Sequence, residues 1–456
     1  MLYIDDRLNG ESPPPPRPTL TPDPYIQAQR ASYILCDLLT RAGYFLSLEK
    51  CIIVPVQKLV HLGTGIDTIE ATFFFPEDKK GKFICLREKI LSDISVTIQT
   101  LQKFVGKCVS MSLVVPGAKI YTRQCNKLIS TMIKQGRSRT KLPDGARAEI
   151  EHWRFVDNDM KPKAWREERH TSITISSDAS GYGWGAVLHT PQGPQASVSL
   201  RDYFQEQDYK KDINCKEAKA VAFTLQAAKD WISNTRVLMR VDNKAVVDAW
   251  QGEGARSLSL NEEIKGIFEK TVELNIALSM VHISTHDNQA DYPSRQLSKM
   301  DCMLAPHIWD RLQAEFGGKT GHTIDLMALD SNAQRDRSGN ALRHYTPYPT
   351  PESAGVDMFR FDPSTSPRGD RENAYVFPPI GMISTVVNFL IQHSAKVTIV
   401  VPKLSPLPIW WPTLSRAATT SIKISDVGST SALLFPTKAG FQAGKTFHHE
   451  LWAFRM

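Results

Sequence analysis

Four acidic residues, Asp178, Glu217, Asp242 and Asp291, are the residues of this chain best suited to chemistry. Asp178 and Asp242 each end a run with the residue types of a β-strand. Glu217 lies early in an apolar-periodic helix, and Asp291 lies where a turn passes into a helix. Carboxylates in such places can meet at one edge of a sheet. Because four converging carboxylates repel one another unless cations lie between them, the pattern predicts a two-metal phosphodiester site.

The elements that must position these acids lie between about residues 170 and 300. Their expected order is strand, strand, strand, helix, strand, helix, helix, strand, helix, which predicts a mixed α/β fold. Residues 177–188 read as a strand, a glycine turn and another strand, where small residues let a ligand backbone approach closely. We expect Asn214 to cap the helix that contains Glu217.

Each of these residues also has an ordinary structural explanation. A single Asp at a strand end is usually a turn or cap residue, and a Glu in a first helical turn usually complements the helix dipole. His286 is at least as well explained as a loop histidine, and Asn243 and Asn288 as partners of the backbone. Only the joint occurrence of the four acids favours a metal site.

Residues 166–300 resemble the ribonuclease H domain of retroelement polyproteins, including the ending Asn-Gln-Ala-Asp-Tyr-Pro-Ser-Arg at 288–295. The resemblance implies a ribonuclease H-like mixed sheet with flanking helices. It implies a catalytic and metal-binding set of Asp178, Glu217, Asp242 and Asp291. Two Mg²⁺ ions, with Mn²⁺ as an alternative, would lie about 3.5–4 Å apart there and support cleavage of RNA in an RNA–DNA hybrid. His286 would assist proton transfer.

The N-terminal flank is similar to the end of the palm in reverse transcriptases. The supporting motifs are Tyr-Ile-Asp-Asp at 3–6, the segment 42–51 and His-Leu-Gly at 61–63. The resemblance implies that Asp5 and Asp6 bind metal and that Lys50 protonates pyrophosphate. Residues 1–80 would then be a partial palm, and residues 81–165 a mainly helical thumb and connection. Fingers and upstream palm are missing, so we expect a truncated product or fragment without polymerase activity of its own.

Four basic residues in the helical segment and one later asparagine are candidates for contact with nucleic acid. They are Lys103, Lys107, Arg123 and Lys127, which could track phosphates, and Asn243 beside Asp242. A solvated helix face explains any single one of the four basic residues equally well.

The C-terminal third is expected to be an α/β region in three parts. These are a helix and strand at 301–335, a Pro-rich linker at 336–375 and a small α/β remnant at 376–456. Motifs at 323–328, 375–380 and 410–412 resemble the tail of DIRS-type tyrosine-recombinase retrotransposon polyproteins, which is similar to phage-type adenine methyltransferases. Phe377 stands where such enzymes usually have Asn or Asp to bind the target amine. We therefore expect no methyl transfer.

Composition limits the class of protein. The 456 residues predict about three domains, and the net charge of +7 allows a polyanionic partner. The seven cysteines are scattered without a CxxC pair, which favours reduced thiols over disulfides or zinc. The sequence has no apolar run of membrane-spanning length and no secretory signal. We therefore expect an intracellular protein of the nucleus or cytoplasm, without a membrane partner and of undetermined oligomeric state.

Together these observations predict an α/β and α+β multidomain chain, with a ribonuclease H-type endonuclease of a retrotransposon polyprotein as its function. One alternative is a non-catalytic remnant that binds nucleic acid. Another is a subunit that completes a polymerase together with a separate fingers-palm chain.

Overall fold

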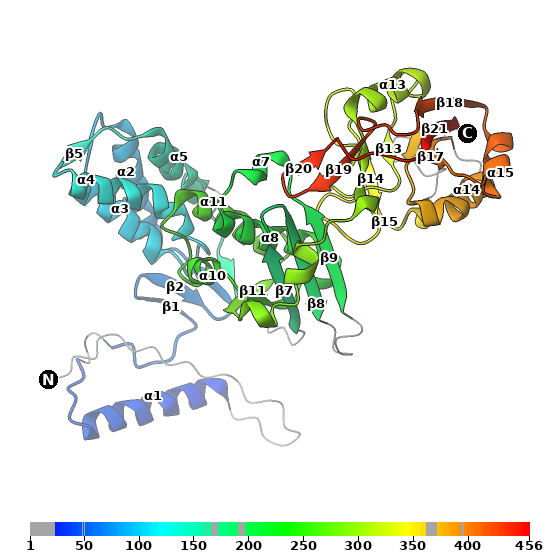
Figure 1. The fold of residues 1–456 in the computed structure, drawn as a ribbon. Helices are drawn as coiled ribbons and strands as arrows, with labels where there is room; N and C mark the ends of the chain where they lie inside the picture. The colour runs from blue at the N-terminus through cyan, green and yellow to red at the C-terminus, as the bar shows by residue number, and fades with distance from the viewer. Residues whose placement is uncertain are drawn as a thin grey trace. The chain divides into compact units, whose positions relative to one another are not determined.

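The computed structural model describes residues 23–47, 49, 51–158, 160–165, 172–189, 197–361, 372–393 and 396–456. The chain forms two compact units, Met1–Glu168 and Arg169–Met456 (Figure 1). Asp5, Asp6 and Lys50 lie outside the described residues, so their predicted roles stay predictions. Among the described residues, the helices are too short or too polar to span a membrane.

The first unit is mainly helical with a small antiparallel sheet. Its helices are α1 (Pro24–Arg41), α2 (Glu77–Ser92), α3 (Ile98–Ser110), α4 (Arg123–Lys134), α5 (Asp144–His152) and α6 (Phe155–Asn158). A four-stranded sheet has the order β1 (Lys58–His61), β2 (Thr64–Asp67), β3 (Thr72–Phe74) and β6 (Lys163–Ala164). The short strands β4 (Val96–Thr97) and β5 (Arg139–Thr140) form a separate pair.

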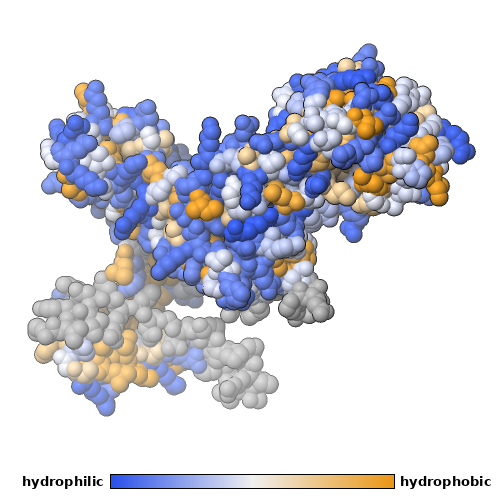
Figure 2. Space-filling model, in the orientation of Figure 1, coloured by the Kyte–Doolittle hydropathy of each residue, from blue (hydrophilic) through white to orange (hydrophobic). Residues whose placement is uncertain are grey.

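Aromatic side chains form the centre of this unit. Phe83, Phe104 and Trp153 are buried together, with the rings of Phe83 and Phe104 stacked at 5.4 Å. The buried Arg87 guanidinium is satisfied by Asp157 and by the carbonyl oxygen of Trp153. By contrast, α1 buries no residue, and its apolar side chains form an exposed orange surface in Figure 2.

A five-stranded mixed sheet begins the second unit. Its strands are β7 (Ser172–Ala179), β8 (Gly183–His189), β9 (Val198–Tyr203), β10 (Arg236–Val241) and β11 (Ala277–His282). Their order is β11-β10-β7-β8-β9, with β7, β8 and β9 antiparallel and β10 parallel to both β7 and β11. The helices are α7 (Glu206–Tyr209), α8 (Ile213–Ala227), α9 (Lys229–Ile232), α10 (Lys244–Gln251), α11 (Leu258–Glu273) and α12 (Asp291–Ser294).

This sheet with its helices confirms the predicted mixed α/β class. The helix α8 packs on β7 and β8, and α11 packs against α8. One local prediction is wrong: the N-cap of α8 is Asp212, whose carboxylate accepts a hydrogen bond from the backbone nitrogen of Cys215. Asn214 already lies inside the first turn, so its side chain is available to other partners.

The C-terminal part of the second unit has a seven-stranded sheet. Its strands are β13 (Ile324–Asp325), β14 (Arg343–Thr346), β15 (Gly355–Val356), β16 (Ala374–Val376), β17 (Val397–Lys403), β18 (Thr420–Ser425) and β21 (Glu450–Arg455). Their order is β15-β14-β13-β16-β17-β21-β18. The pairs from β15 to β17 are parallel, and β21 runs antiparallel to both β17 and β18. The helices are α13 (Pro306–Phe316), α14 (Ile383–Gln392) and α15 (Trp410–Ala417).

Residues 336–375, expected to be a linker, include β14 and β15, which extend this sheet from β13. Such short strands lie among proline and polar residues and give no periodic signal. Outside the sheet, β12 (Met303–Leu304) pairs with β19 (Leu433–Thr437), which forms a hairpin with β20 (Gly440–Gln442).

Candidate active site

Three of the four predicted acids lie together in the second unit. Asp178 lies near the end of β7, Asp242 directly follows β10, and Glu217 lies on α8. The parallel register of β7 and β10 places Val241 opposite Ser177, so both aspartates reach the same edge of the sheet. One carboxylate oxygen from each of the three acids lies within 4.8 Å of the others. We call Asp178, Glu217 and Asp242 the acid cluster.

The fourth acid, Asp291, lies beside the acid cluster but is paired differently. It is the first residue of α12, and its Oδ1 accepts a hydrogen bond of 2.7 Å from Nε of Arg295. Burial is the main cause of the raised pKa of Asp178, and the negative charges of Asp242 and Asp291 add to it. Arg295 therefore neutralises Asp291 in this arrangement.

Neighbouring groups fix the carboxylates of the acid cluster. Oδ2 of Asp178 accepts a hydrogen bond of 2.5 Å from the hydroxyl of Ser294, and Oδ1 lies 3.4 Å from Nδ2 of Asn288. Oε2 of Glu217 accepts a hydrogen bond of 3.1 Å from the backbone nitrogen of Ala179. Side chains restrained in this way hold their oxygens in one geometry, which a metal site requires.

The electrostatics of the acid cluster favour a cation. Burial is the main cause that raises the pKa of Glu217 to about 9, and the charges of Asp178 and Asp242 add to it. Burial likewise raises the pKa of Asp178 to about 6, against the opposing effect of the Ser294 hydrogen bond. Buried carboxylates with raised pKa values lack a compensating positive charge. An all-oxygen donor set of this kind fits Mg²⁺ or Mn²⁺.

Two glycines allow α12 to approach the sheet. A Cβ atom on Gly185 would overlap the backbone nitrogen of Ser294 and lie 2.9 Å from the carbonyl oxygen of Ala290. A Cβ atom on Gly183 would lie 3.0 Å from the carbonyl oxygen of Ser294. The sequence interpretation assigned this space to a ligand backbone. In the structure it is occupied by the backbone of α12 and the turn before it.

The other predicted residues of this region lie near these elements. His286 is exposed on the 3-10 turn Thr285–Asp287, and within the described residues its ring has no hydrogen-bond partner. Asn243 caps α10 by accepting a hydrogen bond from the backbone nitrogen of Val246, and its amide donates to Oδ1 of Asn214 at 2.9 Å. Both polar atoms of the Asn243 side chain are therefore used within the protein.

The predicted basic residues lie in the first unit. Lys103 and Lys107 lie on α3, and the pKa of Lys107 is lowered first by burial and then by the charges of Lys103, Lys82 and Lys79. We call these four lysines the basic cluster. The side chain of Lys79 also extends to Gly63, in the turn between β1 and β2.

Arg123 and Lys127 lie separately, on α4. The predicted set of Lys103, Lys107, Arg123 and Lys127 is thus divided between two helices. No sequence pattern links Lys79 and Lys82 to Lys103 and Lys107, because the two pairs lie on different helices. Spacing along the chain gives no signal for such a cluster.

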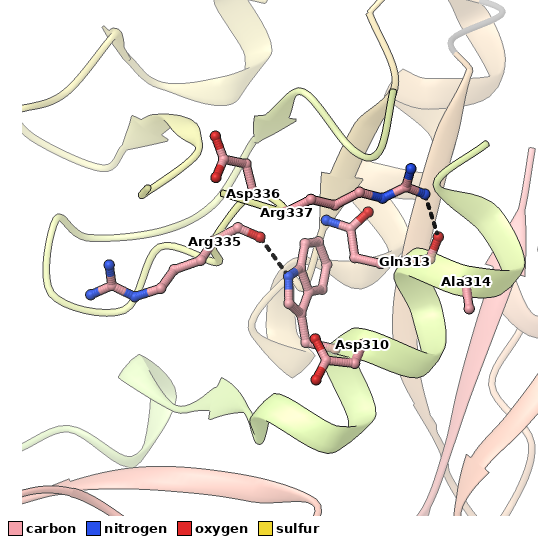
Figure 3. A pocket seen from close by; sticks show the side chains of 7 residues that line it. Asp310, Gln313, Ala314, Arg335, Asp336 and Arg337 are labelled. Atoms are coloured by element: carbon pink, nitrogen blue, oxygen red, sulfur yellow. Dashed lines mark hydrogen bonds between the residues drawn. The ribbon is translucent and has the colours of Figure 1, made fainter. Parts of the chain in front are cut away.

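A cavity of about 310 Å³ lies elsewhere in the second unit, beside α13 (Figure 3). Its walls include Trp309, Asp310, Gln313, Ala314, Arg335, Asp336 and Arg337. The indole nitrogen of Trp309 donates a hydrogen bond of 2.7 Å to the carbonyl oxygen of Arg335. None of the four predicted acids lines this cavity.

Of the known proteins compared with this chain, only solved structures are similar to it. No family model and no curated protein matches the chain. Ribonuclease H1 from the archaeon Halobacterium salinarum is 20% identical, with a TM-score of 0.24 over 27% of this chain and 94% of that one. LC11-RNase H1, solved in complex with an RNA/DNA hybrid, is 22% identical, with a TM-score of 0.23 over 26% and 92%.

A foamy viral protease-reverse transcriptase, also solved with an RNA/DNA hybrid, matches a longer part of this chain. It is 16% identical, with a TM-score of 0.28 over 62% of this chain and 37% of that one.

Proposed function

We propose that this chain is a ribonuclease H-type endonuclease that hydrolyses the RNA strand of an RNA–DNA hybrid. The observation that supports it most is the convergence of Asp178, Glu217 and Asp242 within 4.8 Å at one edge of a mixed sheet. The motifs of the acids and of the flanking segments favour an origin in a retroelement polyprotein, and the C-terminal motifs favour the DIRS type.

The acid cluster, joined by Asp291, would hold two divalent cations. Such cations would supply an activated water and stabilise the departing 3′ oxygen of the scissile phosphate. The chain itself contributes the geometry: Ser294 and Asn288 fix Asp178, and the Ala179 backbone fixes Glu217. Asp291 must exchange its Arg295 partner for a cation. Its side chain is 33% exposed, which leaves room for this exchange.

Protonation would control occupancy of the site. Because the pKa of Glu217 is raised to about 9, its carboxyl group holds a proton at neutral pH until a cation displaces it. Cation binding is therefore coupled to proton release. The affinity for Mg²⁺ should rise with pH across the neutral range.

The basic cluster would help to hold the substrate by its backbone. Lys79, Lys82, Lys103 and Lys107 place four positive charges on α2 and α3, and phosphates are the natural partners of such charges. Contacts of this kind do not depend on base sequence. We therefore propose binding that follows the shape and charge of the hybrid.

The test is Mg²⁺-dependent digestion of a hybrid by the full chain and by Asp242→Asn. The matched control is Asp248→Asn, at an exposed position on α10 outside the acid cluster. We expect Asp242→Asn to lose at least about 10²-fold in rate, because even the partners that orient metal ligands contribute about 10–100-fold, while the control keeps the parental rate. Equal digestion by Asp242→Asn and the parent would overturn the proposal. A parent that binds the hybrid without cleaving it in Mg²⁺ or Mn²⁺ would favour the non-catalytic remnant.

A further inference from the structure

The loop after β13 makes polar contacts with the part of the chain that forms the acid cluster. The Ser331 hydroxyl donates a hydrogen bond of 2.5 Å to Oδ1 of Asp202, the buried residue before the end of β9. The backbone nitrogen of Ser331 lies 3.3 Å from the other oxygen of the same carboxylate. Next to it, Nδ2 of Asn332 donates a hydrogen bond of 2.9 Å to the carbonyl oxygen of Asp301.

Asp301 belongs to a short segment that is also bound to β9. Its Oδ2 accepts hydrogen bonds from Arg201 at 3.0 Å and from the Tyr203 hydroxyl at 2.7 Å. The Tyr203 hydroxyl in turn accepts a hydrogen bond of 3.1 Å from the backbone nitrogen of Ser298. We call residues 298–301 the anchor segment. It is held by β9 on one side and by the loop after β13 on the other.

The anchor segment follows α12 after only three residues. The helix α12 spans Asp291–Ser294, and a helix of four residues cannot hold its own position. Its placement therefore depends on its packing against β7, β8 and β9 and on the groups that bind its two ends. Among them, the Tyr182 hydroxyl donates a hydrogen bond of 2.8 Å to the carbonyl oxygen of Arg295, just before the anchor segment.

We propose that Ser331 and Asn332 are positioning residues for the nuclease site. Asn332 acts on the anchor segment directly, and Ser331 acts on it through β9, which binds Asp301. Through the anchor segment both act on α12, and so on Asp291 and on the Ser294 hydroxyl that binds Asp178. This inference rests on the proposed function for its catalytic consequence. The C-terminal part of the chain would then serve the nuclease as a support, through the loop that follows the strand β13.

One side chain allows the support to be removed selectively. Oδ1 of Asn332 accepts a hydrogen bond of 2.7 Å from the backbone nitrogen of Leu329, while Nδ2 binds Asp301. In Asn332→Asp, one side-chain oxygen can still accept the hydrogen bond from Leu329. The donating Nδ2 is replaced by an oxygen, which would face the carbonyl oxygen of Asp301 and repel it. Asn340→Asp, at an exposed position of the same part of the chain, makes the same chemical change away from the contact. Ser331→Ala has Ser338→Ala, also exposed, as its control.

Two measurements on the full-length variants test the proposal. The first is steady-state cleavage of the hybrid at varied Mg²⁺. A displacement of catalytic groups by about 1 Å can cost about 10²-fold, so we expect Asn332→Asp to lower kcat by about 10-fold or more. We expect the Mg²⁺ midpoint to rise and KM for the hybrid to change less than twofold. The second is hydrogen exchange, which should become faster at residues 291–301 and stay unchanged in β7 and β10.

The outcomes separate this inference from the proposed function. Unchanged kcat and unchanged exchange at 291–301, relative to Asn340→Asp, would overturn the positioning role while cleavage by the parent stands. Faster exchange throughout β7 and β10 would also overturn it, because the loss would then be global unfolding. If the parent cleaves no hybrid, the proposed function fails, and the exchange measurement alone decides whether Asn332 holds α12.

Discussion

The hydroxyl of Ser294 donates a hydrogen bond to the carboxylate of Asp178, with 2.5 Å between the two oxygens and 116 positions between the residues in the chain. Both side chains are buried. The contact joins the short helix α12 to the strand β7 at the acid cluster. The Ser294 hydroxyl thus orients Asp178, one candidate metal ligand. Ser294 lies on α12, the same helix that contains Asp291, another candidate ligand.

Removal of this hydroxyl should weaken the site without unfolding the chain. In Ser294→Ala, Asp178 loses a donor that lowers its pKa, so the pKa of Asp178 should rise further above 6. We expect the pH midpoint of Mg²⁺-dependent cleavage to move upward, and stability to fall by about 1–3 kcal/mol. Cleavage rates from pH 5 to pH 9 measure the first effect. Ser279→Ala, exposed on β11, is the control, and an unmoved midpoint in Ser294→Ala would contradict the assigned role.

Glu217 should make the metal-free protein less stable as the pH rises. Its carboxyl group keeps a proton up to about pH 9 in the folded chain and loses it near its ordinary value of 4.5 in the unfolded chain. The unfolding free energy therefore falls between these pH values, by up to about 1.4 kcal/mol per pH unit. Thermal unfolding in a chelator at pH 5, 7 and 9 should show this fall.

Glu217→Gln should flatten that pH dependence, because the glutamine has no proton to lose. Added Mg²⁺ should stabilise the parent at pH 8 and stabilise Glu217→Gln much less. Glu206→Gln, exposed on α7, should behave like the parent. If Glu217→Gln and the parent showed the same dependence of stability on pH, the Glu217 carboxyl group would not be the group that keeps a proton in the folded chain.

A methyl group at Gly185 should displace α12. Its Cβ would overlap the Ser294 backbone, so α12 or β8 must shift, at a typical cost of about 1–3 kcal/mol. We expect Gly185→Ala to lose most of its cleavage activity at temperatures where it is still folded. Gly181→Ala is the matched control, since a Cβ atom there meets nothing within 4 Å. Full activity in Gly185→Ala would mean that the position of α12 is unimportant for catalysis.

The basic cluster should contribute to the salt dependence of hybrid binding. Each lysine that contacts a phosphate adds about 0.9 to the slope of log affinity against log salt. Lys103→Ala together with Lys107→Ala should therefore reduce the slope by about two and weaken binding equally for different sequences. Binding titrations at several salt concentrations measure this. Lys134→Ala, exposed at the end of α4, should leave the slope unchanged.

The sequence was a good guide to the acids because their local positions restrict where they can lie. Asp178 and Asp242 end strands, and neighbouring parallel strands end at the same edge of a sheet. The location of Glu217 follows from its place on the helix α8, which packs on β7. The α/β class followed in the same way, from the order of periodic segments.

Other features depend on contacts that no local pattern encodes. Asp202 and Ser331 are single polar residues in dissimilar surroundings, and only the folded chain brings them together. The two-residue strand β15 has too few side chains to show an alternation. The spacing of Gly183 and Gly185 suggested a close approach correctly, but not that the approaching group is α12.

The pairing of β12 with β19 has a consequence for synthesis on the ribosome. The strand β12 follows the anchor segment after one residue, whereas β19 begins at Leu433. A nascent chain must therefore grow by more than a hundred residues after α12 before β12 finds its neighbour. The strand after the anchor segment is therefore paired late, long after the acids of the acid cluster have been translated.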